Sequence, residues 1–201
     1  MSVNEKRVAE SRASDSTDDS RVATTTVDDT RAARRPAARV PAIWVLDTNV
    51  VLDWLWFSDP AFAPLKLFLE ATLARRLTML ATRADCRFEL ERVLGYANFS
   101  IDTARRGAIL AAYDAHHAIM APASNPNGSG ANPLPACRDP DDQKFLEVAR
   151  DVGAHWLITR DTALLELAGR VRHTHGFAIL EPRAAAILCN RGAGIDEEAS
   201  I

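Results

Sequence analysis

Apolar and polar residues follow one another along the chain in blocks that predict strands and helices in turn. Residues 43–46 are continuously apolar and end at Asp47, which is typical of a buried parallel strand. Similar short runs predict strands at 77–81, 155–159 and 177–180. Helical spacing or helix-start residues predict helices at 50–57, 60–76, 83–96, 102–120, 139–153, 162–168 and 182–189. Strands that alternate with helices predict an α/β fold with a parallel sheet.

Composition divides the chain into three parts. Residues 1–40 are rich in Ser, Thr, Asp, Arg and Ala and almost lack large apolar side chains, which predicts a disordered tail. Residues 41–190 have the composition of one folded domain, and residues 191–201 are expected to be a flexible C-terminus. Within the domain, Pro, Asn, Gly and Ser at 122–135 predict a loop. His173 and His175 are expected in a surface turn that ends at Gly176.

Charge and cysteine content limit the possible partners and compartments. The net charge is −3 and the pI is near 6.0, so any nucleic-acid contact must come from a local basic patch. The three cysteines are far apart, which fits a reducing cytoplasm better than a disulfide framework. We expect no membrane span and no signal peptide, because no long apolar run is present.

Acidic residues lie at several ends of the predicted elements. Asp47 and Asp161 each follow a predicted strand, and Asp142 lies in the first turn of the helix that leads to Asp161. Ligands of an open parallel sheet bind beyond the carboxyl ends of its strands, so these three carboxylates are expected to converge. Glu89 lies on a predicted helix among apolar residues, and one face of that helix must turn inward.

A cluster of carboxylates is stable only with a counter-charge, and oxygen ligands suit Mg²⁺ or Mn²⁺. Such ions support phosphodiester hydrolysis. Asp47 and Asp142 are the expected direct ligands, while Asp161 and Glu89 are expected to act through water or on a second ion. Each acid also has a simpler interpretation: the aspartates as helix-capping residues and Glu89 as an exposed side chain. The order of the four along the chain favours the metal site.

Four segments carry a resemblance to PIN-domain nucleases. The first is Val45-Leu46-Asp47-Thr48-Asn49-Val50, and the second is Glu89-Leu90-Glu91-Arg92-Val93-Leu94. The third runs from Cys137 through Asp139-Pro140-Asp141-Asp142 to Ala149 and is similar to a branch of toxins from type II toxin–antitoxin pairs. The fourth is Leu157-Ile158-Thr159-Arg160-Asp161.

The resemblance implies a PIN-like three-layer α/β/α sandwich around a mainly parallel sheet of about four to five strands. It also implies a metal-dependent endoribonuclease with Asp47, Glu89, Asp142 and Asp161 as its acids, an RNA substrate, a cognate antitoxin and a possible homodimer. Asn49 and Thr159 are expected to support the acids through hydrogen bonds. Glu91 competes with Glu89 for the inward position, and Asp139 is a possible further ligand. Lys144, Arg138 and Arg160 are candidates for holding RNA phosphates.

Three other interpretations stay open. The chain is a solitary RNA-processing enzyme, a degenerate PIN domain that only binds, or a phosphohydrolase with an aspartyl nucleophile. The last of these needs a second Asp two residues after the first, where this chain has Asn49.

Overall fold

The structure, a computed structural model, describes residues 40–57, 59–122 and 133–197, without the side chains of 98 and 192–197. Its centre is a sheet of five parallel strands in the order β3-β2-β1-β4-β5. These are β1 (Ala42–Leu46), β2 (Thr78–Thr82), β3 (Ile119–Met120), β4 (Trp156–Ile158) and β5 (Ala178–Leu180). Because β1 pairs with both β2 and β4, the carboxyl ends of these three strands lie next to one another.

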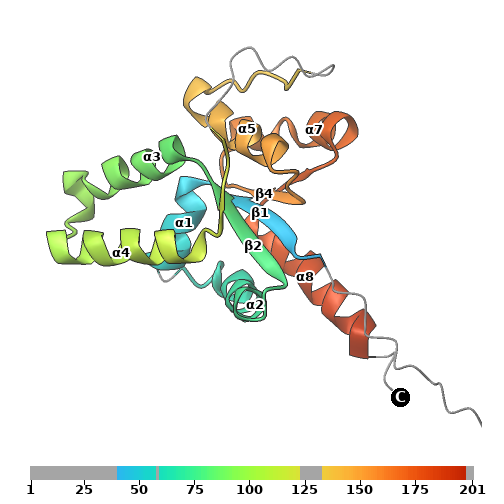
Figure 1. Cartoon of the computed structure of the whole chain (residues 1–201), viewed down its shortest axis with the longest axis horizontal. Coiled ribbons are helices and arrows are strands. Elements are labelled where there is room, and N and C mark those ends of the chain that lie inside the picture. Colours follow the sequence, from blue (N-terminus) through green and yellow to red (C-terminus); the bar gives the residue numbers. More distant parts are fainter. Residues whose placement is uncertain (1–39, 58, 123–132, 198–201) are drawn as a thin grey trace, which may run out of the picture. The chain divides into compact units, whose positions relative to one another are not determined.

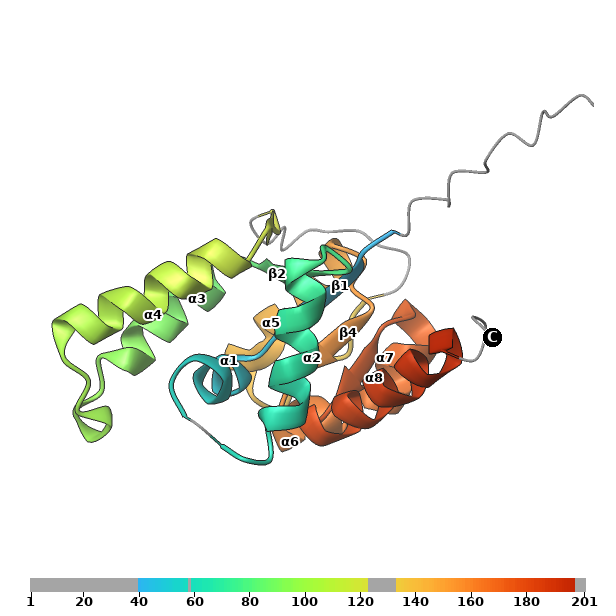
Figure 2. The ribbon, with the colours of Figure 1, turned by 90° about the horizontal axis from the view of Figure 1, so that it is seen from below.

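Helices follow the strands and cover the sheet. They are α1 (Thr48–Leu55), α2 (Ala63–Ala74), α3 (Ala84–Leu94), α4 (Thr103–His116), α5 (Gln143–Asp151), α6 (Thr162–Leu165), α7 (Ala168–His175) and α8 (Pro182–Glu197). Two short 3₁₀ turns, η1 (Ala97–Phe99) and η2 (Pro140–Asp142), complete the elements. In Figure 1, α2 and α8 lie on one side of the sheet and α5 and α7 on the other. Figure 2 shows α3 and α4 side by side.

Alternate residues of the strands enter different cores, because successive side chains of a strand point to opposite faces. On β1, Trp44 and Leu46 join α1, α2, α3, α4 and α8 in one buried cluster. Val45, between them, joins α5, α6 and α7 in the other. Ile158 and Leu157 of β4 divide between the two clusters in the same way. Helix–sheet–helix layering of this kind agrees with the predicted three-layer α/β/α sandwich.

Three elements differ from the sequence-based prediction. The helix predicted to reach Met120 ends at His116, because residues 119–120 pair with β2 as an edge strand. The predicted turn at 173–176 is the end of α7, whose one fully buried side chain, Val171, gives too little apolar periodicity to predict a helix. The closing helix continues beyond Cys189 to Glu197, since two glycines weaken a helix by only about 1 kcal/mol each without stopping it.

Two predicted regions fall wholly or mainly beyond what the structure describes. The predicted tail, up to residue 39, and residues 123–132 of the predicted loop lie outside the described residues, as do residues 198–201. Within the described part of the chain, no helix is both long enough and apolar enough to cross a membrane.

Candidate active site

Asp47 lies at the carboxyl end of β1, in the middle of the sheet. Its side chain is buried, and Thr159 Oγ1 donates a hydrogen bond of 2.7 Å to its Oδ2. Burial raises the pKa of Asp47 to about 6, and the charges of Glu89 and Asp161 add to the rise, while the Thr159 hydrogen bond opposes it. Asp47 is therefore a carboxyl group whose ionisation is costly in the surroundings that the fold provides.

Asp161 follows β4 and is connected to Asp47 through one side chain. The Oγ1 of Thr159, which donates to Asp47, also accepts a hydrogen bond of 2.9 Å from the Asp161 amide. Asp161 Oδ1 in turn accepts from the amides of Ala163 and Leu164 at 2.6 and 3.3 Å, so this residue caps α6. The capping interpretation of Asp161 therefore holds, and its charge still acts on Asp47.

Asp142 ends η2 and is half-buried at the start of α5. Burial is the largest cause of a rise in its pKa to about 7; the charges of Asp47, Asp161 and Asp139 raise it further, and the charge of Lys144 lowers it. The charges of Asp47 and Asp161, from two other segments of the chain, thus act on Asp142. That these three residues form one metal site stays a prediction.

Glu89, on α3, is turned inward, and Glu91 is not. The Glu89 side chain is 18% exposed, and its Oε2 lies 2.6 Å from Lys144 Nζ. Glu91 is 53% exposed and pairs with Arg87 at 3.0 Å. Since the charge of Glu89 also contributes to the raised pKa of Asp47, Glu89 is the glutamate of this segment that belongs with the other acids.

The expected supporting residues have different surroundings. Thr159 is fully buried and bridges Asp47 and Asp161, as described above. Asp139 is exposed, and its Oδ1 accepts a hydrogen bond of 2.9 Å from the Asp141 amide, so it caps η2. Asn49 is exposed, and support of the acids by its side chain stays a prediction.

The basic residues near the acids already have acidic partners. Arg160 pairs with Asp53 at 2.9 Å and with Asp59 at 2.7 Å. Arg138 pairs with Glu166 at 3.4 Å. An RNA phosphate must therefore compete with these carboxylates, which weakens the expectation that Arg138, Arg160 and Lys144 form a ready phosphate site.

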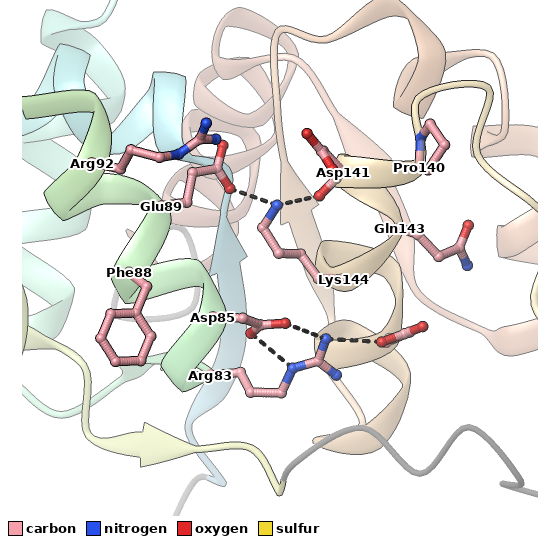
Figure 3. A pocket seen from close by; sticks show the side chains of 10 residues that line it. Arg83, Asp85, Phe88, Glu89, Arg92, Pro140, Asp141, Gln143 and Lys144 are labelled. Atoms are coloured by element: carbon pink, nitrogen blue, oxygen red, sulfur yellow. Dashed lines mark hydrogen bonds and ion pairs between the residues drawn. The ribbon is translucent and has the colours of Figure 1, made fainter. Parts of the chain in front are cut away.

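Sequence reasoning missed a groove between α3 and α5 (Figure 3). Arg83 follows β2 and is buried, and its Nη2 lies 2.8 Å from both Asp85 and Glu147. Arg83 thereby joins α3 to α5 at the floor of the groove, which also contains Glu89 and Lys144. The only signal for it in the sequence was the position of an arginine directly after a strand.

The chemistry of the acids fits a hard divalent cation. Their donors are carboxylate oxygens, and burial, followed by the charges of neighbouring acids, raises the pKa values of Asp47 and Asp142. In their present positions, no three His, Cys, Asp or Glu side chains among the described residues are grouped so that they could hold a metal ion. One oxygen of Asp161 is bound to the α6 amides and Glu89 is bound to Lys144, so an ion would have to compete for both.

The PIN-domain family model matches residues 44–163, which is more than half of the chain and includes all four acids. The chain therefore belongs to the PIN-domain family, whose members are generally nucleases and hence hydrolases. The match confirms the predicted PIN fold, in agreement with the five-stranded parallel sheet and its covering helices. No curated protein sequence matches the chain.

Proposed function

We propose that this chain is a divalent-metal-dependent endoribonuclease and the toxin of a toxin–antitoxin pair. The observation that carries the nuclease proposal is the position of Asp47 and Asp161 after the paired strands β1 and β4, near enough to Asp142 for both charges to act on it. Burial and, after it, the charges of neighbouring acids raise the pKa values of Asp47 and Asp142, and a bound cation would favour their ionised forms. Because the chain belongs to a family whose members are generally nucleases, phosphodiester hydrolysis is the reaction that we assign to such a site.

Each acid has a role in this proposal. Asp47 and Asp142 hold the ion directly, and Asp161 and Glu89 act through water or on a second ion. When bound, Mg²⁺ or Mn²⁺ supplies charge stabilisation for the phosphodiester and activates the attacking water. Thr159 keeps the Asp47 carboxylate oriented by its hydrogen bond to Oδ2. The stacked layers around the sheet hold these groups on rigid elements.

The nuclease proposal is tested with the purified full chain and a labelled single-stranded RNA. We expect cleavage with Mg²⁺ or Mn²⁺, none with excess chelator, and recovery when the ion is restored. A single-stranded DNA of the same sequence serves as the matched substrate and tests the preference for RNA. Binding of RNA without cleavage under every ion tested would contradict the nuclease and favour a degenerate PIN domain that only binds.

The toxin proposal rests on the resemblance of the segment Cys137–Ala149, and it includes a cytoplasmic location, a cognate antitoxin and a possible homodimer. We expect expression of the chain alone to arrest bacterial growth, and expression of an Asp142→Asn variant to be harmless. A small reading frame beside the gene, with a DNA-binding start, should encode a protein that restores growth. Harmless expression of a folded chain that cleaves RNA in vitro would contradict the toxin role and leave the nuclease standing.

A further inference from the structure

One face of α3 carries two exposed aromatic rings with a cation between them. Phe88 and Arg92 lie one helical turn apart, and both line the groove between α3 and α5 (Figure 3). Phe88 is 66% exposed, although phenylalanine is among the residues that proteins most often bury. Tyr96, two residues beyond the end of α3, is 42% exposed, and the Arg92 guanidinium group lies 5.9 Å from the centre of its ring. We call these three residues the α3 platform.

Arg92 differs from the other basic residues of the groove, because those already have acidic partners. The remaining charged residues that line it form ion pairs at 2.6–2.8 Å, with one exception: Arg83 with Asp85 and Glu147, and Lys144 with Glu89. The exception is Asp141, which lies on η2 across the groove (Figure 3). Among the described residues, no ion pair involves Arg92, whose guanidinium group faces the Tyr96 ring. The α3 side of the groove therefore has a positive charge that an anionic ligand can use.

This combination of groups suits a single-stranded nucleic acid. Unpaired bases stack on exposed aromatic rings, and arginine side chains bind phosphate groups. Glu89, one of the four acids of the proposed site, lies in the same groove, so a strand held on the platform extends toward those acids. Aromatic residues and arginine also occur at protein interfaces, but the centre of such an interface is poor in charged residues. Most residues that line this groove are charged, which favours the nucleic acid.

We propose that the α3 platform binds unpaired RNA beside the candidate active site, with bases stacked on Phe88 and Tyr96 and a phosphate group on Arg92. This inference rests on the RNA substrate in the proposed function and names the surface that would hold the strand. Every base has a face that can stack on a ring, so we expect binding with little sequence preference. A duplex covers those faces, so we expect weaker binding of double-stranded RNA.

The rings are tested by the affinity of the full chain for a short labelled single-stranded RNA, followed by fluorescence anisotropy in excess chelator. Phe88→Leu and Tyr96→Leu keep an apolar side chain but remove the ring, and each should weaken binding by at least about fivefold. Phe88→Tyr and Tyr96→Phe keep the ring, and their affinities should stay within about twofold of the unchanged protein. Because all of these side chains are exposed, we expect each variant to fold, and circular dichroism checks this.

The cation is tested by the salt dependence of the same binding. Arg92→Met removes one phosphate contact, so the slope of log affinity against log salt concentration should become shallower by about 0.7. Arg92→Lys keeps the charge and should keep the slope. Arg172→Met is the matched control, because it removes an exposed arginine from the last turn of α7, away from the groove, and should leave the slope unchanged.

Two results would overturn the inference. The first is an RNA affinity that Phe88→Leu, Tyr96→Leu and Arg92→Met leave unchanged. If those variants instead altered the oligomeric state in sedimentation experiments, the platform would be a protein interface. The second is an equal loss of affinity for a duplex of the same sequence, since base faces would then play no part. In both cases the unchanged protein can still cleave RNA, so the proposed function stands. An unchanged protein that neither binds nor cleaves RNA would overturn both.

Discussion

Two groups of carboxylates differ in their surroundings, one in the groove between α3 and α5 and one at the carboxyl edge of the sheet. In the groove, Asp85 and Glu147 share the buried Arg83, and this guanidinium group lowers the pKa of Asp85. At the edge of the sheet, burial and neighbouring acids raise the pKa values of Asp47 and Asp142 to about 6 and about 7. The same kind of side chain is therefore ionised easily in one group and with difficulty in the other.

The difference separates a structural role from a functional one. A carboxylate with a cation at contact distance joins α3 to α5, and its charge is already compensated. Buried carboxylates without such a cation cost stability, and a fold retains that cost mainly where a ligand or a reaction needs the charge. Acidic residues occur in both groups. What distinguishes the candidate active site from the ion pairs in the groove is whether a basic side chain contacts the carboxylates.

The largest expected effect comes from neutralising the aspartates that lack a cation. Asp142→Asn and Asp47→Asn should each lower kcat/KM for RNA cleavage by at least about 100-fold, because each removes a charge from the proposed site of metal and transition-state stabilisation. The metal-free stability should stay equal or rise, since a buried repulsion is removed. Asp141→Asn, at the exposed neighbouring position, is the matched control and should cleave normally. Full activity in both site variants would contradict the assignment.

The second prediction concerns pH. Both carboxyl groups have raised folded-state pKa values, from 3.8 to about 6 and about 7. The stability that they contribute is thus fully present below their unfolded pKa of 3.8 and is lost as the pH rises from there through about 6 and about 7. We expect the Tm of the metal-free protein to fall over this range, as followed by calorimetry in chelator. Mn²⁺ affinity should rise by about tenfold per pH unit for each carboxyl that loses a proton.

The double variant Asp47→Asn/Asp142→Asn is the control for this pH dependence. Its Tm should fall less over the same range, because the two titrating groups are absent. An equal fall in the variant and in the unchanged protein would show that other groups cause the effect.

The third prediction concerns removal of Arg83, the basic residue that pairs with Asp85 and Glu147. Arg83→Met should lower the free energy of unfolding by about 1–3 kcal/mol, since Asp85 and Glu147 lose charged hydrogen bonds but keep partial access to water. Chemical denaturation measures this loss. The number of Mn²⁺ ions bound by the folded variant should not change. Lower stability with unchanged Mn²⁺ binding would support a purely structural role for the Arg83 ion pairs. Loss of Mn²⁺ binding in a folded variant would contradict that role.

The smallest expected effect comes from Thr159→Val, which removes the hydroxyl group between Asp47 and Asp161. The lost hydrogen bond lowers the pKa of Asp47 in the unchanged protein, so the pH profile of Mn²⁺ binding should move to higher pH. Loss of this bond should cost about 1 kcal/mol of unfolding free energy. Thr159→Ser retains the hydroxyl group and should restore the profile; a profile that does not return would contradict this role.

Local patterns were sufficient to predict much of the fold, and they led to the proposed site. Apolar runs predicted β1, β2, β4 and β5, and the positions of Asp47 and Asp161 after two of them predicted that the acids converge. The edge strand β3 was missed because two residues carry almost no pattern, and its pairing with β2 decides its conformation. Helix α7 was missed because its side chains are mostly polar.

Which residues are acidic, and which strand ends carry them, can be read from local sequence patterns, because the periods of strands and helices are local properties. Which carboxylates obtain a cation depends instead on how the helices pack. Glu89 meets Lys144, and Glu147 meets Arg83, through the packing of α3 against α5, whose residues are far apart in the chain. An ion pair forms only when two charged groups lie within a few ångströms of each other. The hydrophobic periodicity of one segment does not predict its distance from another segment. The contrast between compensated and uncompensated acids is therefore a property of the folded chain.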